Sequence, residues 1–310
     1  MGLIDMRLRF IAFYGLALLV FVVPLYAQED RNPGQVVKNG LGMEFISLPS
    51  GEFLMGSNAA DTELACALTK NVKDCKERWL ANEKPKHRVK IDAGILIMRF
   101  EVTQSQWRWV MGTTWQQQRD KQGKRRVFFG LFEKNRSLLG VGDDLPMYYV
   151  SWEDANAFVH RMNQRNDGFI YSLPSESEWE YACRAATTSL FSFGNKLYLS
   201  NGNAIAENDM YLEKVVKVVT YSPNAWGLFD MEGNVAEWTA DMYFESYDTL
   251  PVDGSPNLSK RAKHYGENVR VLRGGGWNSS QFNARCARRG YDSEKFGWHD
   301  VGFRLTARKK

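Results

Sequence analysis

"VLRGGGWNSSQFNARCARRG", residues 271–290, places three consecutive glycines before a tryptophan, and then a single cysteine among arginines. The stretch is open to three interpretations: a catalytic loop with a reactive thiol, a ligand-binding surface, or a framework segment that fixes the fold. These differ in the state of Cys286, because only a free thiolate can act as a nucleophile or as a metal ligand. The function of the stretch therefore depends on whether another cysteine pairs with Cys286.

The composition bounds the fold class. The chain has 310 residues, enough for one large domain or two small ones with a buried core. Ten tryptophans and 13 tyrosines among 26 glycines favour an irregular, loop-rich fold in which large rings fill the space between short elements. A net charge of +4 is too small to indicate a nucleic-acid partner.

The N-terminus has the pattern of a secretory signal peptide. Two arginines precede the apolar run "IAFYGLALLVFVVPLYA", and the polar stretch "QEDRNPGQ" follows. We expect residues 1–27 to be removed after Ala27, leaving residues 28–40 as a tail and placing the protein in the periplasm or outside the cell. The alternative is an uncleaved anchor, since the run approaches the length that spans a bilayer. No later segment is apolar enough to span a membrane.

The expected export of the protein affects the interpretation of its four cysteines. An even number of cysteines in an oxidising compartment favours disulfides over free thiols or metal ligands. Cys66 and Cys75 lie in one polar segment and would close a short loop, which leaves Cys183 to pair with Cys286. Of the three pairings that four cysteines allow, this one is the most natural.

Helix and strand signals concentrate in the first two thirds of the chain. Residues 43–57 predict strand, turn and strand, and the alternating pattern returns over residues 87–103. Helices are predicted over 103–112, 151–165 and 173–187, each beginning at a serine or threonine N-cap. After Thr187 the helical signals stop. The basic run 119–126 and the following "VFFGLF" are interpreted as a solvated loop insertion beside a core strand, with a partner-binding or membrane-facing patch as the alternative.

A set of phrases gives a family resemblance. Eight phrases occur in order: "GMEFISLPSGEFLMGS", "NEKPKHRVKI", "FEVTQSQWRWVMG", "LPMYYVSWEDANAFV", "YSLPSESEWEYACRAAT", "PNAWGLFDMEGNVAEWTADMY", "VLRGGGWNSS" and "DVGFRLTAR". Together they resemble the formylglycine-generating enzyme, or sulfatase-modifying factor, family over residues 41–308. The resemblance implies one α+β domain with a C-type-lectin-like core that is low in regular secondary structure and often holds calcium.

Two calcium sites follow from the resemblance. In "GNVAEWTAD" the residues themselves supply Asn234, Glu237 and Asp241, and hard cations prefer carboxylate, amide and carbonyl oxygens. The resemblance assigns a side-chain oxygen to Glu237 and carbonyl oxygens to Gly233 and Val235, with Asn234 beside them. It assigns a second site to the side chains of Asn203 and Asp209 and the carbonyls of Ala204 and Tyr211. The alternative is a network of caps and turns without metal.

The thiol chemistry of the family requires residues that are missing here. The resemblance implies that two cysteines between the glycine phrase and a third, structural cysteine bind copper and oxidise a substrate cysteine. In this chain residues 278–285 contain no cysteine, and Gly276 replaces the family's serine. Thiolates are the ligands that select Cu(I). We therefore expect no copper, and a structural disulfide from Cys286 to Cys183.

Two functions remain. The first is binding or accessory maturation of a protein, peptide or small-molecule ligand by polar and aromatic residues of the C-terminal segment, which suit adaptable recognition: Trp277, Asn278, Ser280, Phe282, Asn283, Tyr291, Phe296, Trp298 and His299. A retroelement-diversified surface is a variant of this hypothesis. The second is an oxidase-like modifying enzyme, of the type that matures siderophores in the periplasm or generates formylglycine. Its weak catalytic candidates are Tyr291, Glu294, His299 and Asp300.

Overall fold

The computed structural model describes residues 34–75, 79–126, 140–198, 200–204, 214–259, 263–264 and 267–310. The predicted signal peptide (1–27) and the "VFFGLF" segment lie outside the described residues. Of the predicted tail, residues 36–38 form the first strand, β1 (Val36–Lys38), which pairs with β2 (Glu44–Ser47). The ordered domain therefore starts before residue 41.

The three predicted helices are confirmed, and each begins where its capping residue indicated. They are α3 (Gln104–Met111) after Thr103, α5 (Trp152–Gln164) after Ser151, and α6 (Glu176–Arg184) after Ser175. Each N-cap side chain accepts a hydrogen bond from the third helical residue, whose own side chain accepts one from the N-cap backbone. The Trp107 ring of α3 stacks on Phe158 of α5 at 5.8 Å between ring centroids, so the two helices share one core.

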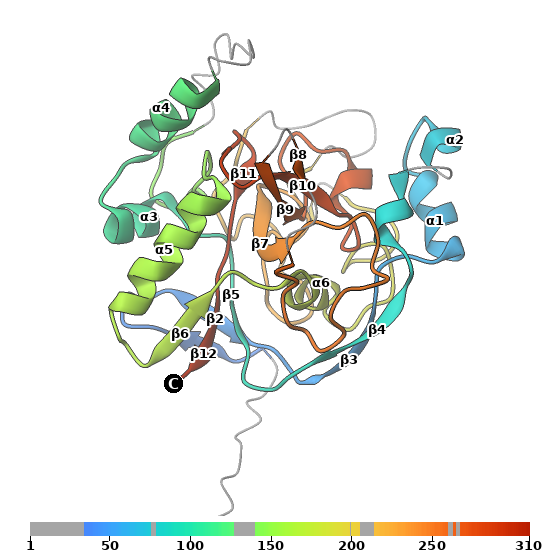
Figure 1. Ribbon diagram of the computed structural model, residues 1–310, viewed down its shortest axis with the longest axis horizontal. Helices are drawn as coiled ribbons and strands as arrows, with labels where there is room; N and C mark the ends of the chain where they lie inside the picture. The colour runs from blue at the N-terminus through green and yellow to red at the C-terminus, as the bar shows by residue number, and fades with distance from the viewer. Residues whose placement is uncertain are drawn as a thin grey trace, which may run out of the picture.

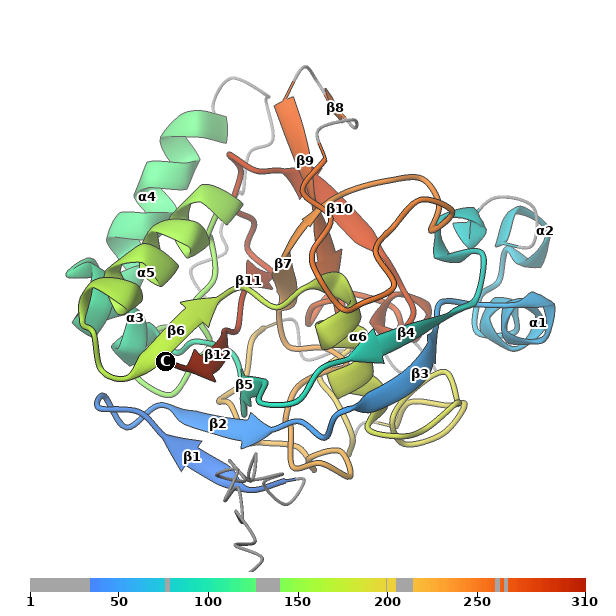
Figure 2. The ribbon, with the colours of Figure 1, turned by 60° about the horizontal axis from the view of Figure 1, so that its bottom comes forward.

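A five-stranded antiparallel sheet joins the two ends of the described chain. Its order is β1-β2-β5-β12-β6, with β5 at Leu96–Met98, β6 at Phe169–Ser172 and β12 at Thr306–Lys309. Thr306 lies opposite Ile97 on one side and Ser172 on the other. The C-terminal strand thus lies inside the sheet, between β5 and β6 from much earlier in the chain (Figure 2).

A second sheet carries the glycine phrase. Its order is β10-β9-β7-β11, with β7 at Ala236–Met242, β9 at Glu267–Arg273, β10 at Gly290–Ser293 and β11 at Val301–Gly302, while β8 (Lys263–His264) pairs with β9. The β7–β11 pair is parallel and aligns Val301 with Ala236. The remaining strands, β3 (Gly51–Met55) and β4 (His87–Ile91), form a separate antiparallel ribbon.

The described chain contains helical segments that were not predicted. They are α1 (Ala59–Cys66), α2 (Val72–Asp74), η2 (Ala81–Glu83), α4 (Trp115–Arg126) and η4 (Gln281–Ala284). The basic run 119–126 is therefore helical, and its interpretation as a loop was wrong. Figures 1 and 2 both show α3, α4 and α5 on one side of the molecule and α1 and α2 on the other. Among the described residues, none of the helices has the length and apolar character needed to cross a bilayer.

Helix α4 is attached mainly through amide groups. The Gln118 carboxamide donates hydrogen bonds to the Tyr149 carbonyl and to the Asp154 carboxylate. Gln122 donates to the same carboxylate and accepts a hydrogen bond from the backbone N–H of Gly297. The basic run lacked apolar periodicity because these contacts, rather than an apolar face, hold the helix in place.

Four buried arginines fix the C-terminal segment to the rest of the fold. Each has a buried glutamate partner: Arg273 pairs with Glu180, Arg285 with Glu83, Arg289 with Glu176 and Arg304 with Glu237. The glutamates come from η2, α6 and β7. A buried charge is costly unless it is paired, so these four pairs constrain the path of residues 273–304.

Candidate functional site

Cys286 is bonded to Cys183, as the sequence predicted. Both residues are fully buried, and the bond ties the segment after the glycine phrase to helix α6. The second predicted disulfide, Cys66–Cys75, links the end of α1 to α2. All four cysteines of the chain are therefore in disulfides, and the chain holds no free thiol in this state.

The three glycines shape the turn between β9 and η4. Gly274 and Gly275 have φ angles of 86° and 68°, in the left-handed region that residues with a Cβ avoid. At Gly276 the constraint is space, because a Cβ there would lie 2.9 Å from the Cβ of Asp300. The turn thus brings the backbone of the glycine phrase close to the 298–300 segment.

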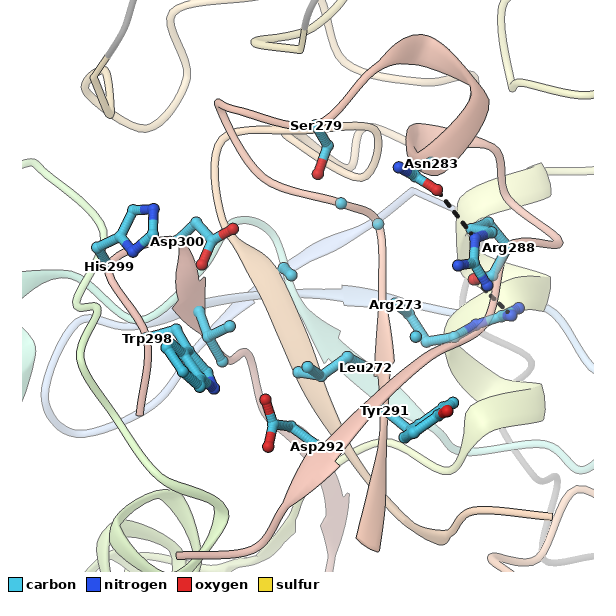
Figure 3. A pocket seen from close by; sticks show the side chains of 15 residues that line it. Leu272, Arg273, Ser279, Asn283, Arg288, Tyr291, Asp292, Trp298, His299 and Asp300 are labelled. Carbon is cyan, nitrogen blue, oxygen red and sulfur yellow. Dashed lines mark hydrogen bonds between the residues drawn. The ribbon is translucent and has the colours of Figure 1, made fainter. Parts of the chain in front are cut away.

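A cavity of about 370 Å³ lies beside this turn (Figure 3). It is lined by Ala236, Leu272, Arg273, Gly274, Gly275, Ser279, Asn283, Arg288, Gly290, Tyr291, Asp292, Trp298, His299, Asp300 and Val301. Asp300 and Trp298 stand on one side of the cavity in Figure 3, and Asn283 and Arg288 on the opposite side. The Ser279 hydroxyl oxygen accepts a hydrogen bond from the Gly276 N–H, 3.0 Å away, which holds Ser279 at the rim.

A second cavity of about 560 Å³ continues the first. Its lining shares Asn283, Arg288 and Tyr291 with the first cavity and adds Trp79, Ala81, Asn82, Tyr243, Glu245 and Phe282. The Tyr291 ring packs on Tyr243 at a tilt of 32°, with 4.1 Å between ring centroids, and Trp79 meets Phe282 edge to face at 5.5 Å. We call the two cavities together the C-terminal groove, and such aromatic walls with a few polar groups are typical of ligand sites.

Most of the predicted ligand-binding residues lie at this groove, and the others lie beside it. Phe282, Asn283, Tyr291, Trp298 and His299 line one or both cavities. The other four do not line the cavities: Trp277 is buried in the main core, and Asn278, Ser280 and Phe296 are partly buried. Sequence reasoning missed Trp79 and Tyr243, which reach the groove only through the fold. It also did not select Ser279, Arg288 and Asp292, although they lie in the C-terminal segment itself.

The four weak catalytic candidates do not form one acid–base group. The Glu294 carboxylate is bound to Arg270 at 3.3 Å and to Asn268 at 2.7 Å, and Glu294 does not line the cavities. The His299 ring is 3.1 Å from the Asn278 amide nitrogen and meets the Trp277 ring at 5.5 Å. In Figure 3 the His299 ring points away from the Asp300 carboxylate. The groove therefore offers separate polar groups rather than a catalytic pair.

Glu237, the predicted side-chain ligand of calcium, is in a dense hydrogen-bond network. Its Oε1 accepts a hydrogen bond from Arg304 at 2.7 Å, and its Oε2 accepts from Arg304 at 2.7 Å and from Trp179 at 2.9 Å. The neighbouring loop is equally constrained, since the Asn234 amide oxygen accepts from the Val216 N–H and the Asn234 carbonyl from the Trp277 N–H. Gly233 and Val235 flank Asn234 in this loop, where a Cβ on Gly233 would lie 2.5 Å from the Asn203 carbonyl.

Two buried carboxylates near Glu237 have oxygens without a hydrogen bond among the described residues. Neither oxygen of Glu101 and only one oxygen of Asp230 has a hydrogen bond, although both residues are buried. Burial and the mutual repulsion of these carboxylates raise the pKa of Glu101 well above its usual range, and burial raises the pKa of Asp230 to about 6. Three carboxylates act on one guanidinium, that of Arg304, but their oxygens do not all lie within the 4.8 Å of one another that one shared metal ion would need. Sequence reasoning missed Glu101 and Asp230, although both lie within the quoted phrases.

The second predicted calcium site is only partly described. Asp209 and Tyr211 lie outside the described residues. Asn203 and Ala204 are buried, and the Asn203 amide nitrogen donates to the Lys214 carbonyl at 3.0 Å. The carbonyl of Asn203 accepts a hydrogen bond from the Asn234 N–H at 2.9 Å, so the two predicted calcium loops are in direct contact.

Comparison with known proteins identifies the family. The model of the sulfatase-modifying factor enzyme 1-like domain matches residues 32–309, nearly the whole of the described chain. The chain belongs to this family. The formylglycine-generating enzyme of Bos taurus is 25% identical, over 91% of this chain and 80% of that protein.

Other proteins that are similar to this chain differ in name and length. The inactive C-alpha-formylglycine-generating enzyme 2 of Mus musculus is 28% identical over 53% of this chain and 49% of that protein. The solved structure of PvdO from Pseudomonas aeruginosa has a TM-score of 0.68 at 23% identity, covering 90% of this chain and all of that one, which shows a shared fold. The matched region spans about a fifth of another relative, the serine/threonine-protein kinase pkn1 of Chlamydia pneumoniae.

Proposed function

We propose that this family member is an exported binding or accessory maturation protein that holds its ligand in the C-terminal groove without thiol chemistry. The observation that carries the proposal is the pairing of Cys286 with Cys183 beside an open groove. A copper-thiolate oxidation needs free thiolates, and none is available in this state. The inactive relative, so described in its name, supports such a role within the family.

The groove itself supports binding. Its walls combine exposed rings, with Trp79 38% and Tyr291 45% exposed, and polar side chains from η4 and the 298–300 segment. Aromatic side chains supply contact area at low entropic cost, and a few polar groups orient the ligand. The buried arginine–glutamate pairs hold the framework around the groove, so it is largely formed before binding.

The disulfides support a location outside the reducing cytosol, in the periplasm or the extracellular space, as the N-terminal pattern predicts. Cysteines buried in disulfides are typical of oxidising compartments. The proposal is tested by following the mature form of the full chain in cell fractions. A cytosolic product that keeps residues 1–27 would contradict it.

We also propose that Glu101 and Asp230 hold one Ca²⁺ beside Glu237, whose own oxygens stay hydrogen-bonded to Arg304 and Trp179. The unpaired oxygens of Glu101 and Asp230 support this assignment, and the carbonyls of Gly233 and Val235 come from the adjoining loop. The ion would neutralise buried charge and stabilise the 230–237 segment, which leads into strand β7. Its role is structural.

The binding proposal is tested with the full mature chain. A library of small molecules and short peptides is screened by thermal shift, and each hit is measured by calorimetry. Asn283→Trp fills the point that the two cavities share and should weaken the hits at least 10-fold, whereas Lys90→Trp on exposed β4 should change them less than 2-fold. Hits that bind Asn283→Trp as tightly as the unsubstituted protein would place the ligand elsewhere.

A further inference from the structure

We propose that the cavity between Asp300 and Arg288 takes an elongated zwitterion of amino-acid to dipeptide size, with its cationic nitrogen at Asp300 and its carboxylate at Arg288. The inference rests on the proposed function of the C-terminal groove and names the class of ligand. It is carried by one anion and one cation that stand on opposite sides of the same cavity and have no counter-ion in the described part of the chain (Figure 3).

Asp300 provides the negative end. Its carbonyl oxygen accepts a hydrogen bond from the Ala236 N–H at 2.7 Å, which fixes the backbone beside β7. Its carboxylate lines the cavity and has no hydrogen bond or ion pair with any described residue. A carboxylate held in this way binds an ammonium or guanidinium group by a charge-assisted hydrogen bond.

Arg288 provides the positive end. Its Nε donates to the Asn283 amide oxygen at 3.0 Å, and Nη1 donates to the Arg289 carbonyl. Within the described residues Nη2 has no hydrogen bond, and no carboxylate forms an ion pair with this guanidinium. Arg273, Arg285 and Arg289, by contrast, each have a glutamate partner. Burial also lowers the pKa of Arg288, against the opposing effect of the Glu83 carboxylate.

The two bonds that Arg288 does make fix the guanidinium without neutralising it. A planar guanidinium with free N–H groups prefers a carboxylate, which can accept two parallel hydrogen bonds. The Asn283 side chain adds a donor at the same end, because its amide oxygen is used by Arg288 and its amide nitrogen has no acceptor among the described residues.

The space between Asp300 and Arg288 determines the size and polarity of the middle part of the ligand. The walls there are Leu272, Tyr291 and Trp298, which favour an apolar or aromatic body, and the Asp292 carboxylate lies beside Trp298 (Figure 3). A volume of about 370 Å³ suits a molecule of amino-acid to dipeptide size. Because the charged groups stand on opposite walls, the ligand's own charges must be separated by that body. A free ω-amino acid and a short peptide meet this description equally.

The test compares one rigid zwitterion with its singly charged isosteres. The probes are 4-(aminomethyl)benzoate, 4-methylbenzoate and 4-methylbenzylamine, measured on the full mature chain by calorimetry and saturation-transfer NMR. We expect the zwitterion to bind at least about 10-fold more tightly than either isostere, the usual effect of one charge-assisted hydrogen bond. Gly-Phe and 6-aminohexanoate then distinguish a peptide from a free amino acid.

Two variants assign the ends. Asp300→Asn should lower the affinity for the zwitterion to that for 4-methylbenzoate and leave the affinity for 4-methylbenzoate unchanged. Arg288→Gln should lower the affinity for the zwitterion to that for 4-methylbenzylamine and leave the affinity for 4-methylbenzylamine unchanged. A variant that merely misfolds would lose all three probes, so the crossed pattern is diagnostic. Equal binding of the three probes to the unsubstituted protein, or no binding of any, would overturn the zwitterion. If the zwitterion proposal failed but Asn283→Trp still weakened the library hits, the groove would remain a binding site. The proposed function and the proposed ligand class can therefore fail separately.

Discussion

Gly276 and Asp300 are in contact across the turn, and a Cβ on Gly276 would lie 2.9 Å from the Asp300 Cβ and 3.0 Å from its carbonyl oxygen. The glycine therefore sets the position of the carboxylate at one end of the cavity. The relationship also separates this chain from the family pattern, in which a serine is expected at this point of the glycine phrase.

Gly276→Ser should move Asp300 out of place. Overpacking of this kind lowers the free energy of unfolding by about 1–3 kcal/mol. The affinity for the rigid zwitterion should fall to the value measured for the Asp300→Asn variant. The free energy of unfolding is measured by urea titration and the affinity by calorimetry. Gly40→Ser is the matched control, since a Cβ at Gly40 meets no atom within 4 Å. Unchanged affinity in Gly276→Ser would show that the contact does not position Asp300.

The two disulfides should differ in their contribution to stability. Cys183–Cys286 closes a loop of 103 residues and Cys66–Cys75 one of 9 residues. The chain-entropy relation gives about 4.7 and about 2.6 kcal/mol respectively. Replacing each pair by alanines and measuring urea unfolding should give the larger loss for Cys183→Ala/Cys286→Ala. The reverse order would mean that loop entropy does not govern these bonds.

The buried pair of Glu83 and Arg285 should be sensitive to the loss of one partner. Both side chains are fully buried, and the two hydrogen bonds between them measure 2.8 and 3.0 Å. Glu83→Gln leaves an uncompensated guanidinium, which costs about 3–5 kcal/mol. The control is Glu52→Gln, whose ion pair with Arg88 is exposed and contributes about 1 kcal/mol or less. Similar losses from the two variants would argue against a tightly packed pair.

Calcium should stabilise the protein more at neutral than at acidic pH. The metal binds ionised carboxylates, and protons compete for Asp230 below its pKa of about 6. At 100 times the dissociation constant, calcium adds about 2.7 kcal/mol to the free energy of unfolding. We expect a clear rise in Tm with Ca²⁺ at pH 7.5, a smaller rise at pH 5, and none in Asp230→Asn. A Ca²⁺ effect retained by Asp230→Asn would place the ion elsewhere.

Stability without calcium should decrease as the pH rises towards 8. Burial raises the pKa of Glu232 to about 7 from its ordinary 4.5, so between these values the folded state binds more protons than the unfolded chain. The free energy of unfolding then falls with pH across this window, by up to about 3 kcal/mol for this group. Glu232→Gln should flatten that part of the profile, measured by urea unfolding from pH 4.5 to 8. An unchanged slope would assign the effect to other carboxylates.

Local signals explain which elements could be predicted. The helices at Thr103, Ser151 and Ser175 were recognised because a capping box is contained within four consecutive residues. Helix α4 also begins with a capping box, formed by Thr114 and Gln117, but it has no apolar periodicity, since Gln118 and Gln122 find their partners in other segments. The basic composition of the run therefore favoured a solvated loop over a helix.

The sequence could predict which segment forms the site, but not how the side chains of the site are placed relative to one another. The sequence alone shows that residues 278–285 contain no cysteine, and it predicts Cys183 as the partner of Cys286. The structure confirms this disulfide. The opposition of Arg288 and Asp300 depends on β10 and β11, which place them on facing walls. Trp79 and Tyr243 join the groove from segments far away in the chain. Glu101 and Asp230 became a candidate cation site only when their unpaired oxygens were known.

The attachment of α4 has a mechanical consequence. Detachment of this helix would break the hydrogen bonds of Gln118 and Gln122 and the ion pair between Lys121 and Asp154. Only Trp115, at its first turn, is buried as a large apolar anchor. Release of Gln122 would also free the N–H of Gly297, next to Trp298 on the wall of the groove. A partner that pulls on this helix would therefore act on the wall of the proposed binding groove.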